Sequence, residues 1–559
     1  MTERTNRSRL TLGRQVAAIA VAAALLAAGC SSDSSDSSPV TTAKTTTTTA
    51  AKTECTQGAT IDKVEAVPVV DTSTDHTVTS FDGTKIRAHW FPTAGAEPTP
   101  TILMGPGWSL PGDTSVSGGT AIFGALSIKG MLDRGYNVLT WDPQGFGKST
   151  GSAQVNSAKA EGRDVQVLLD WVAAQPSAKT DAKGDPRVGM VGFSYGGGIQ
   201  LITAAIDCRV DAIVPGLAWH SLSTALFKHR TVKQGWSSVL VGSAAAGSLD
   251  PHITSASDSG RETGTLSAED EAWFVDRGPA DLVDKINIPT LFVQGTVDTL
   301  FTLDEAITNQ ASLRSRGVPT AMLWFCGGHG VCLVDPGDTT RVTDASFAWL
   351  DRYLKGDTSA SVVPGFETVD QDGASWTADA YPDEADKTVT AASASPATLA
   401  LTTDSAAGAI TVPPENTDLL GSLVAPITPS PAGTAVNLTV KTGSVDGLAL
   451  GAPTVKLTYS GTTPKGPEPT RVFAQLIDET RKVIVGNQIT PIPLKLDGKT
   501  HTTSVDLEVI AQYLRPGQTL TLQLVASTVA YAIPRVGGTV TLNQVSITIP
   551  VVTKGLTKS

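Results

Sequence analysis

A serine between two glycines is the residue of this sequence best placed to do chemistry. The stretch Gly192-Phe193-Ser194-Tyr195-Gly196 fits the pattern Gly-x-Ser-x-Gly, in which a tight strand-to-helix turn lifts a serine hydroxyl clear of a sheet. The largely apolar run 187–193 precedes it, as a buried strand would. A second match surrounds Ser149, but a polar loop precedes that serine. We therefore predict that Ser194, and not Ser149, is a nucleophile.

Ser149 also ends the triplet Gly147-Lys148-Ser149, which is similar to the end of a phosphate-binding loop. Such a loop requires a glycine five positions before its second glycine. Asp142 occupies that position. The sequence therefore argues against an ATPase, and we expect this loop to be structural.

A serine hydroxyl needs a base to remove its proton, and the base needs a carboxylate to orient it. On folds with such an elbow the three residues follow in the order serine, acid, histidine. Asp298 follows the apolar run 289–294, and His329 follows the run 320–325 with a glycine on each side. Since sites of open α/β sheets lie at the carboxyl ends of the strands, we predict that Asp298 and His329 complete a triad with Ser194.

Other residues compete for these roles. Asp304 is the alternative acid, but we expect it to open the next helix, while Asp281 and Asp284 precede the strand and lie at its wrong end. Among the other histidines, His220 follows the expected strand 208–214. It either lines the pocket or packs within an inserted cap, which we expect over 217–284.

The negative charge that develops on a carbonyl oxygen during acyl transfer needs two fixed donors. One is the main-chain N–H of Tyr195, directly after the nucleophile. The second should come from the loop after the expected strand 101–104. Pro106 has no N–H to donate, so we predict that the amide of Trp108 is the second donor; the alternative is that Trp108 only anchors the loop.

The elements that position these residues alternate between strands and helices. Strands alternating with helices are typical of a mostly parallel α/β sheet. The stretch 217–284 interrupts this rhythm with helical segments, as an inserted cap would. The runs expected to be strands are 101–104, 136–141, 187–193, 208–214, 289–294 and 320–325, with a hairpin over 78–91.

The character of the chain changes after the first domain, which we place at 61–356. We expect a linker over 357–391 and a second domain over 392–559. Apolar residues alternate with polar ones in this last part, for example at Val545, Ile547 and Ile549. This period of two with few helical runs favours an antiparallel β-sandwich.

These features together resemble the Xaa-Pro dipeptidyl-peptidase-like family, which includes cocaine esterase. The resemblance is carried by the Gly107-Trp108 turn, the loop 142–151, the elbow at Ser194, the inserted cap, and the stretch Tyr513-Leu514-Arg515-Pro516-Gly517-Gln518. It implies an α/β-hydrolase fold with a helical cap, followed by a jelly-roll-like sandwich. It also implies a serine hydrolase that acts on a small ester or peptide substrate. We favour a carboxylesterase, with an Xaa-Pro dipeptidyl-peptidase as the alternative.

The amino terminus has the pattern of an export signal. Four arginines precede the apolar run 16–28, which is long enough for a signal-peptide core and too short to span a bilayer. Small residues then lead directly to Cys30, as in a bacterial lipoprotein. We expect a signal peptide over 1–29, lipid on Cys30, a Ser/Thr-rich tether over 30–60, and an extracytoplasmic location at the membrane.

Export implies an oxidising compartment, in which cysteines pair. With Cys30 lipidated, four cysteines remain. Cys326 and Cys332 are six positions apart across a glycine-rich turn, and we predict that they form a disulfide. Cys55 and Cys208 would then form the second disulfide. The alternative is four free, buried thiols.

The composition excludes some partners. The formal net charge is -12 and no basic block stands out, so nucleic acid is a poor candidate. No spacing of cysteine and histidine suggests a metal, and the proposed chemistry needs no cofactor. A different class of function also remains at this point, a non-catalytic surface lipoprotein that binds through its sandwich.

Overall fold

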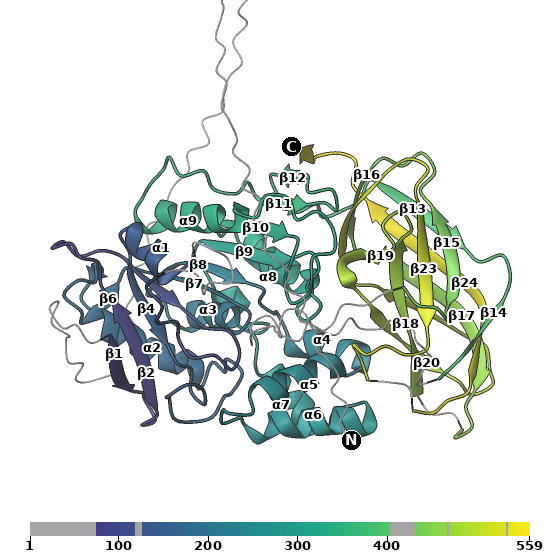
Figure 1. Ribbon diagram of the computed structural model, residues 1–559, viewed down its shortest axis with the longest axis horizontal. Helices are drawn as coiled ribbons and strands as arrows, with labels where there is room; N and C mark the ends of the chain where they lie inside the picture. The colour runs from purple at the N-terminus through teal and green to yellow at the C-terminus, as the bar shows by residue number, and fades with distance from the viewer. Residues whose placement is uncertain (1–73, 118–125, 403–430, 467–468, 533–534) are drawn as a thin grey trace, which may run out of the picture. The chain divides into compact units, whose positions relative to one another are not determined.

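The computed structural model describes residues 74–117, 126–402, 431–466, 469–532 and 535–559 (Figure 1). The expected signal peptide and tether, with Cys30 and Cys55, lie outside these residues. Within them, no helix has both the length and the apolar character needed to cross a membrane.

A long mixed sheet organises the first domain. Its inner strands, from β4 to β11 along the sheet, run parallel, and the strands at both ends are antiparallel. Parallel strands are covered on both faces, which explains why they appear in the sequence as continuous apolar runs. In spatial order the strands are β1 (Asp75–Thr79), β2 (Lys85–Phe91), β4 (Asn137–Trp141), β3 (Thr101–Met104), β7 (Val188–Phe193), β8 (Val210–Gly216), β9 (Thr290–Gly295), β10 (Thr320–Phe325), β11 (Phe366–Val369), β12 (Ser375–Ala378) and β25 (Thr557–Lys558).

Helices cover both faces of this sheet. The apolar residues of α1 (Ile128–Asp133) and α9 (Arg341–Leu354) share one buried cluster with one face of the strands. Those of α2 (Glu161–Ala173), α3 (Tyr195–Ile206) and α8 (Leu303–Ser315) share another cluster with the opposite face. The arrangement is the three-layer α/β architecture that the alternating sequence pattern predicts.

The helical cap lies between β8 and β9, where the sequence loses its alternating rhythm. Its local signals are clear at α6: Asp250 accepts a hydrogen bond from the amide of His252, Pro251 occupies the first turn, and Gly264 ends the helix with a left-handed φ of 78°. The cap elements are α4 (Leu222–Leu226), η1 (Lys228–Arg230), α5 (Gln234–Ser243), α6 (Pro251–Thr263), α7 (Ala268–Val275) and η2 (Val283–Lys285).

The segment 357–391, expected to be a linker, differs from that expectation. It contains β11 and β12, which extend the main sheet, and β13 begins within it. β11 and β12 have four residues each, too few for a hydrophobic period to show in the sequence. A small hairpin of β5 (Thr180–Ala182) and β6 (Asp185–Pro186) stands apart from the sheet.

The second domain is a sandwich of antiparallel strands around its own core. Val545, Ile547 and Ile549 are buried there, as their alternation predicts.

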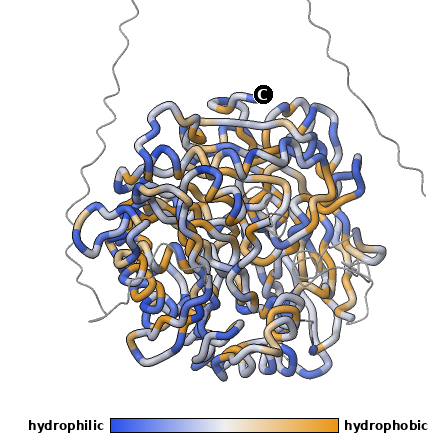
Figure 2. The backbone as a smooth tube through the Cα atoms, turned by 60° about the vertical axis from the view of Figure 1, so that its left-hand side comes forward, coloured by the Kyte–Doolittle hydropathy of each residue, from blue (hydrophilic) through white to orange (hydrophobic). Residues whose placement is uncertain are grey.

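Across the described chain as a whole, hydrophilic residues gather along the outer loops (Figure 2). The strands of the second domain form two main sheets and one further pair. One sheet holds β13 (Lys387–Ala392), β14 (Ala397–Ala400), β17 (Thr454–Thr462), β21 (His501–Asp506) and β24 (Thr539–Val551); the other holds β15 (Val436–Lys441), β18 (Pro469–Asp478), β19 (Val483–Ile484), β20 (Thr490–Lys495) and β23 (Thr519–Val525); β16 (Gly447–Gly451) pairs with β22 (Ile510–Leu514), and η3 (Val485–Asn487) follows β19.

Candidate active site

Ser194 occupies a strained turn between β7 and α3. Its φ is 59° and its ψ is -117°, a conformation that a residue with a side chain adopts only where the surroundings enforce it. The flanking glycines are required by a close backbone approach. A Cβ on Gly196 would lie 2.1 Å from the main-chain oxygen of Gly105, and one on Gly192 would lie 2.8 Å from the same atom. The Gly-x-Ser-x-Gly pattern is therefore the sequence signature of this packing.

Asp298 lies in the loop after β9 and is fully buried. Its Oδ1 accepts hydrogen bonds from the amides of Leu300 at 2.9 Å and Phe301 at 2.8 Å. Its Oδ2 is 2.8 Å from Nδ1 of His329. A carboxylate accepts, so Nδ1 is the donor, and Nε2 of the imidazole is left to accept a proton.

The glycines around His329 allow its loop to pack against the loop of Asp298. Gly328 has a φ of 118°, and a Cβ there would lie 2.7 Å from Cβ of Asp298. A Cβ on Gly330 would lie 2.1 Å from the main-chain oxygen of Val297. The Thr299 hydroxyl donates to the main-chain oxygen of His329 at 2.6 Å. The acid and the histidine are thus held by their main chains as well as by their side chains.

Two aromatic rings fix the plane of the imidazole. Trp236 and Phe301 stand edge-on to His329, with ring centres 5.7 Å and 5.3 Å away. Ser194 and His329 line the same cavity, together with Trp108. The structure therefore brings Ser194, Asp298 and His329 to one site, at the carboxyl ends of β7, β9 and β10.

A disulfide closes the loop that carries the histidine. Cys326 and Cys332 are bonded, with their Cα atoms 5.4 Å apart. Cys208 is also disulfide-bonded. Because Cys55 lies outside the described residues, the pairing of Cys55 with Cys208 stays a prediction.

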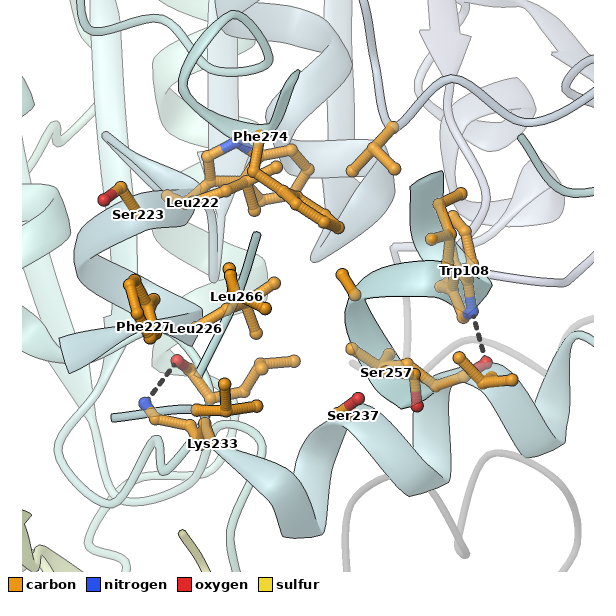
Figure 3. A pocket seen from close by; sticks show the side chains of 18 of the residues that line it. Trp108, Leu222, Ser223, Leu226, Phe227, Lys233, Ser237, Ser257, Leu266 and Phe274 are labelled. Atoms are coloured by element: carbon orange, nitrogen blue, oxygen red, sulfur yellow. Dashed lines mark hydrogen bonds between the residues drawn. The ribbon is translucent and has the colours of Figure 1, made fainter. Parts of the chain in front are cut away.

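The two amides expected to stabilise an oxyanion are available in the structure. No described residue accepts a hydrogen bond from the amide of Tyr195 or from that of Trp108. Tyr195 is the first residue of α3, where main-chain N–H groups have no partner inside the helix. The indole of Trp108 donates to the main-chain oxygen of Leu240 at 2.8 Å (Figure 3). The indole is therefore occupied, and the main-chain amide is the group that Trp108 has left to donate.

Glu161 is a site residue that the sequence did not reveal. It is buried, and its Oε1 accepts a hydrogen bond from the Tyr195 hydroxyl at 3.0 Å. Asn156 donates to the main-chain oxygen of Tyr195 at 2.7 Å. Burial raises the pKa of Glu161 to about 7. At the start of α2 an acidic residue is ordinary, so no sequence signal distinguished it.

Ser149 and His220 both have local roles. Ser149 donates to the main-chain oxygen of Asp142 at 2.7 Å and accepts from the amide of Arg87 at 2.8 Å. His220 does not line either cavity that Ser194 lines. Its Nδ1 lies 2.8 Å from Oδ1 of Asn309, on α8. The pocket role considered for His220 is therefore not found in the structure, and its ring contacts α8, outside the cap, instead.

The cap residues line a second, mainly apolar cavity (Figure 3). Ser194 is also among the residues that line it. Its charged lining residues are Lys233 and Glu271. Lys233 is buried and its ammonium donates to the main-chain oxygen of Leu300 at 2.9 Å. Burial lowers the pKa of Lys233 to about 8. The apolar lining includes Trp108, Val155, Trp219, Leu222, Leu226, Phe227, Val232, Leu240, Ile253, Leu266, Phe274, Leu300 and Phe301.

Comparisons with known proteins give matches over the region that holds this site. The family model described as X-Pro dipeptidyl-peptidase (S15 family) matches residues 82–330, which include Ser194, Asp298 and His329. A search of the curated proteins finds no match.

Solved structures share the fold over both domains. A CocE/NonD family hydrolase from Staphylococcus aureus is 14% identical, with a TM-score of 0.57, over 86% of this chain and 93% of that one. An alpha-amino acid ester hydrolase is 15% identical, with a TM-score of 0.62, over 87% and 98%. An aminopeptidase from a Thaumarchaeota archaeon is 13% identical, with a TM-score of 0.64, over 88% and 98%.

The protein is therefore a serine hydrolase with an α/β-hydrolase domain and an all-β domain, and the predicted fold class is confirmed. Its residues 82–330 match the model of the X-Pro dipeptidyl-peptidase (S15) family, which confirms the family resemblance. Its chemistry is the cleavage of an ester or peptide bond.

Proposed function

We propose that the protein is a carboxylesterase for esters of apolar acids. The observation that carries this proposal is the apolar cavity of the cap, whose lining includes Ser194. A substrate acyl group placed there buries apolar surface and brings its carbonyl carbon to the nucleophile. Burying apolar surface contributes about 25 cal/mol per Å², so a larger acyl group binds more tightly until the cavity is filled.

The reaction runs in two steps. Ser194 attacks the ester carbonyl while His329 takes the hydroxyl proton and Asp298 holds the imidazole. The amides of Tyr195 and Trp108 stabilise the oxyanion, and His329 gives the proton to the leaving alcohol. His329 then activates a water molecule, which releases the acid and restores Ser194.

The charges of the cavity support an ester over a peptide with a free amino terminus. A dipeptidyl-peptidase has to bind an ammonium group, and carboxylates do this best. Glu271 is the carboxylate among the described residues that line the cap cavity. Its Oε1 lies 3.1 Å from Nη1 of Arg230, and Lys233 adds a cation to the lining of the same cavity. These charges therefore make the cavity unfavourable for the ammonium group of a peptide substrate.

The alternative function is an Xaa-Pro dipeptidyl-peptidase. The family match over residues 82–330 favours it. In that case Glu271 would exchange Arg230 for the ammonium of the substrate.

A substrate panel tests the proposal. We expect p-nitrophenyl esters of four- to eight-carbon acids to be cleaved with kcat/KM values far above those of Xaa-Pro p-nitroanilides. Ser194→Ala should lower turnover by on the order of 10³ or more and keep the fold, by circular dichroism, because it removes only the nucleophile. Faster cleavage of the anilides would establish the alternative, and unchanged turnover of Ser194→Ala would exclude this nucleophile.

A further inference from the structure

Two side-chain amides of the β-sandwich reach the loops that carry the acid and the histidine. Nε2 of Gln488 donates to the main-chain oxygen of Asp298 at 2.6 Å. Nδ2 of Asn487 donates to the main-chain oxygen of Val331, two residues after His329, at 2.7 Å. Gln488 and Asn487 are both buried. Two consecutive residues of the second domain therefore hold the two loops of the first.

The backbone around η3 is shaped for this contact. Gly486 has a φ of 64° and Asn487 a φ of 56°, so two consecutive residues are left-handed. Glycine and asparagine adopt this conformation at the lowest cost. A Cβ on Gly486 would lie 3.1 Å from the main-chain oxygen of Thr296, in the loop that leads to Asp298. The turn thus brings its main chain close to the loop that leads to Asp298. This approach places the side-chain amides of Asn487 and Gln488 against the catalytic loops.

The bond from Gln488 completes the environment of Asp298. Both carboxylate oxygens of Asp298 are already engaged, Oδ1 by two amides and Oδ2 by His329. Its main-chain oxygen has the Gln488 amide as a partner. Without that donor the buried main-chain oxygen of Asp298 loses its hydrogen bond to Gln488. This loss destabilises the observed position of the loop that carries Asp298.

We propose that Gln488 and Asn487 are positioning residues, and that their two side-chain hydrogen bonds form a clamp through which the β-sandwich holds Asp298 and His329 in register with Ser194. The second domain then belongs to the catalytic apparatus, beyond any role in solubility or binding. This inference rests on the proposed roles of the triad.

The test is the rate at which a fluorophosphonate probe labels Ser194, because labelling requires the triad but no particular ester. Gln488→Met removes the donor and nearly keeps the side-chain volume. We expect its maximal labelling rate at saturating probe to fall by about 10- to 100-fold, since small misplacements of reacting groups cost this much. The probe concentration at half-maximal rate should stay within about twofold of the wild type, because the substrate cavity is unchanged.

Gln371→Met is the matched control. Gln371 is also buried and also joins the two domains, since it exchanges two hydrogen bonds of 2.8 Å with the main chain of Tyr513. These hydrogen bonds go to Tyr513 and not to a catalytic loop, so the labelling rate of this variant should equal that of the wild type. If Gln488→Met does not fold, Asn487→Asp is measured in its place, because aspartate tolerates the left-handed conformation and lacks the donor.

The outcomes separate the two proposals. A wild-type protein that is not labelled would overturn the triad itself. A labelled wild type with equal rates for Gln488→Met and Gln371→Met, whether both match the wild type or both fall, would overturn the clamp alone. A fall confined to Gln488→Met, or to Asn487→Asp where that variant is used, supports the clamp.

Discussion

At the scale of single residues, the site depends on side chains that the sequence pattern does not mark. Tyr195 is the residue whose amide we propose as an oxyanion donor, and its hydroxyl donates a hydrogen bond to Glu161. Glu161 also accepts hydrogen bonds from two main-chain amides, those of Gln154 and Ser157. A carboxyl group in this position organises the wall behind the nucleophile and titrates near neutral pH.

Replacing Glu161 with glutamine should change how stability depends on pH. The pKa of Glu161 rises from 4.5 to about 7 on folding, so between these values the folded state binds more protons than the unfolded state. The wild type therefore loses stability as pH rises through this window, by about 3 kcal/mol for this group. Urea unfolding at pH 4.5 and pH 7 measures the free energy of unfolding. Between these pH values it should fall more for the wild type than for Glu161→Gln. If the free energies of unfolding of the two proteins differed by the same amount at both pH values, the raised pKa of Glu161 would be refuted.

At the scale of elements, the loops after the parallel strands β9 and β10 pack against each other. The loop of His329 is fixed by Asp298, by Thr299 and by the disulfide between Cys326 and Cys332. Gly328 and Gly330 let it approach the acid loop. The positions of Asp298 and His329 therefore depend on the packing of the two loops against each other, and neither loop fixes them alone.

Removing the disulfide should loosen this loop. A double Cys326→Ser, Cys332→Ser variant frees a loop of about six residues, for which chain entropy predicts a loss of about 2 kcal/mol. We expect lower thermal stability and a reduced kcat, with KM nearly unchanged because the cap cavity is separate from the loop. Steady-state kinetics with one ester and calorimetry measure both effects. A kcat equal to that of the wild type would show that the remaining hydrogen bonds hold His329 by themselves.

At the scale of the whole molecule, the second domain is joined to the first through the catalytic region. Phe473, Val525 and Tyr531 of the sandwich share a buried cluster with Trp108, Tyr195 and Trp236. Glu508, on the sandwich side, accepts hydrogen bonds from Lys228 at 3.0 Å and from Thr302 at 2.9 Å. The cap cavity and the candidate triad thus lie in the part of the first domain that the sandwich contacts.

The location of the whole molecule is a separate proposal, based on the residues before the described part. We propose that the chain is exported and lipidated at Cys30. The wild type should enter the detergent phase in Triton X-114 partitioning and carry the mass of a lipid on its first mature peptide. Cys30→Ser should stay in the aqueous phase with equal specific activity. A mature wild type without lipid would contradict the proposal.

The sequence alone determined the chemistry and the order of its parts. Ser194, Asp298 and His329 stand out because each follows an apolar strand run and has glycine or turn residues nearby, which are local features. The cap and the sandwich show in the change of hydrophobic period, which is also local.

Only the tertiary structure decided which residues support that chemistry. β11 and β12 are too short to have a hydrophobic period. They become strands because β11 pairs with the edge of β10 and β12 then pairs with β11. Glu161, Asn487 and Gln488 are ordinary polar residues until folding brings them to Tyr195, Val331 and Asp298. A hydrogen bond between residues 190 positions apart leaves no trace in the pattern of either segment, because its geometry exists only once both domains have packed.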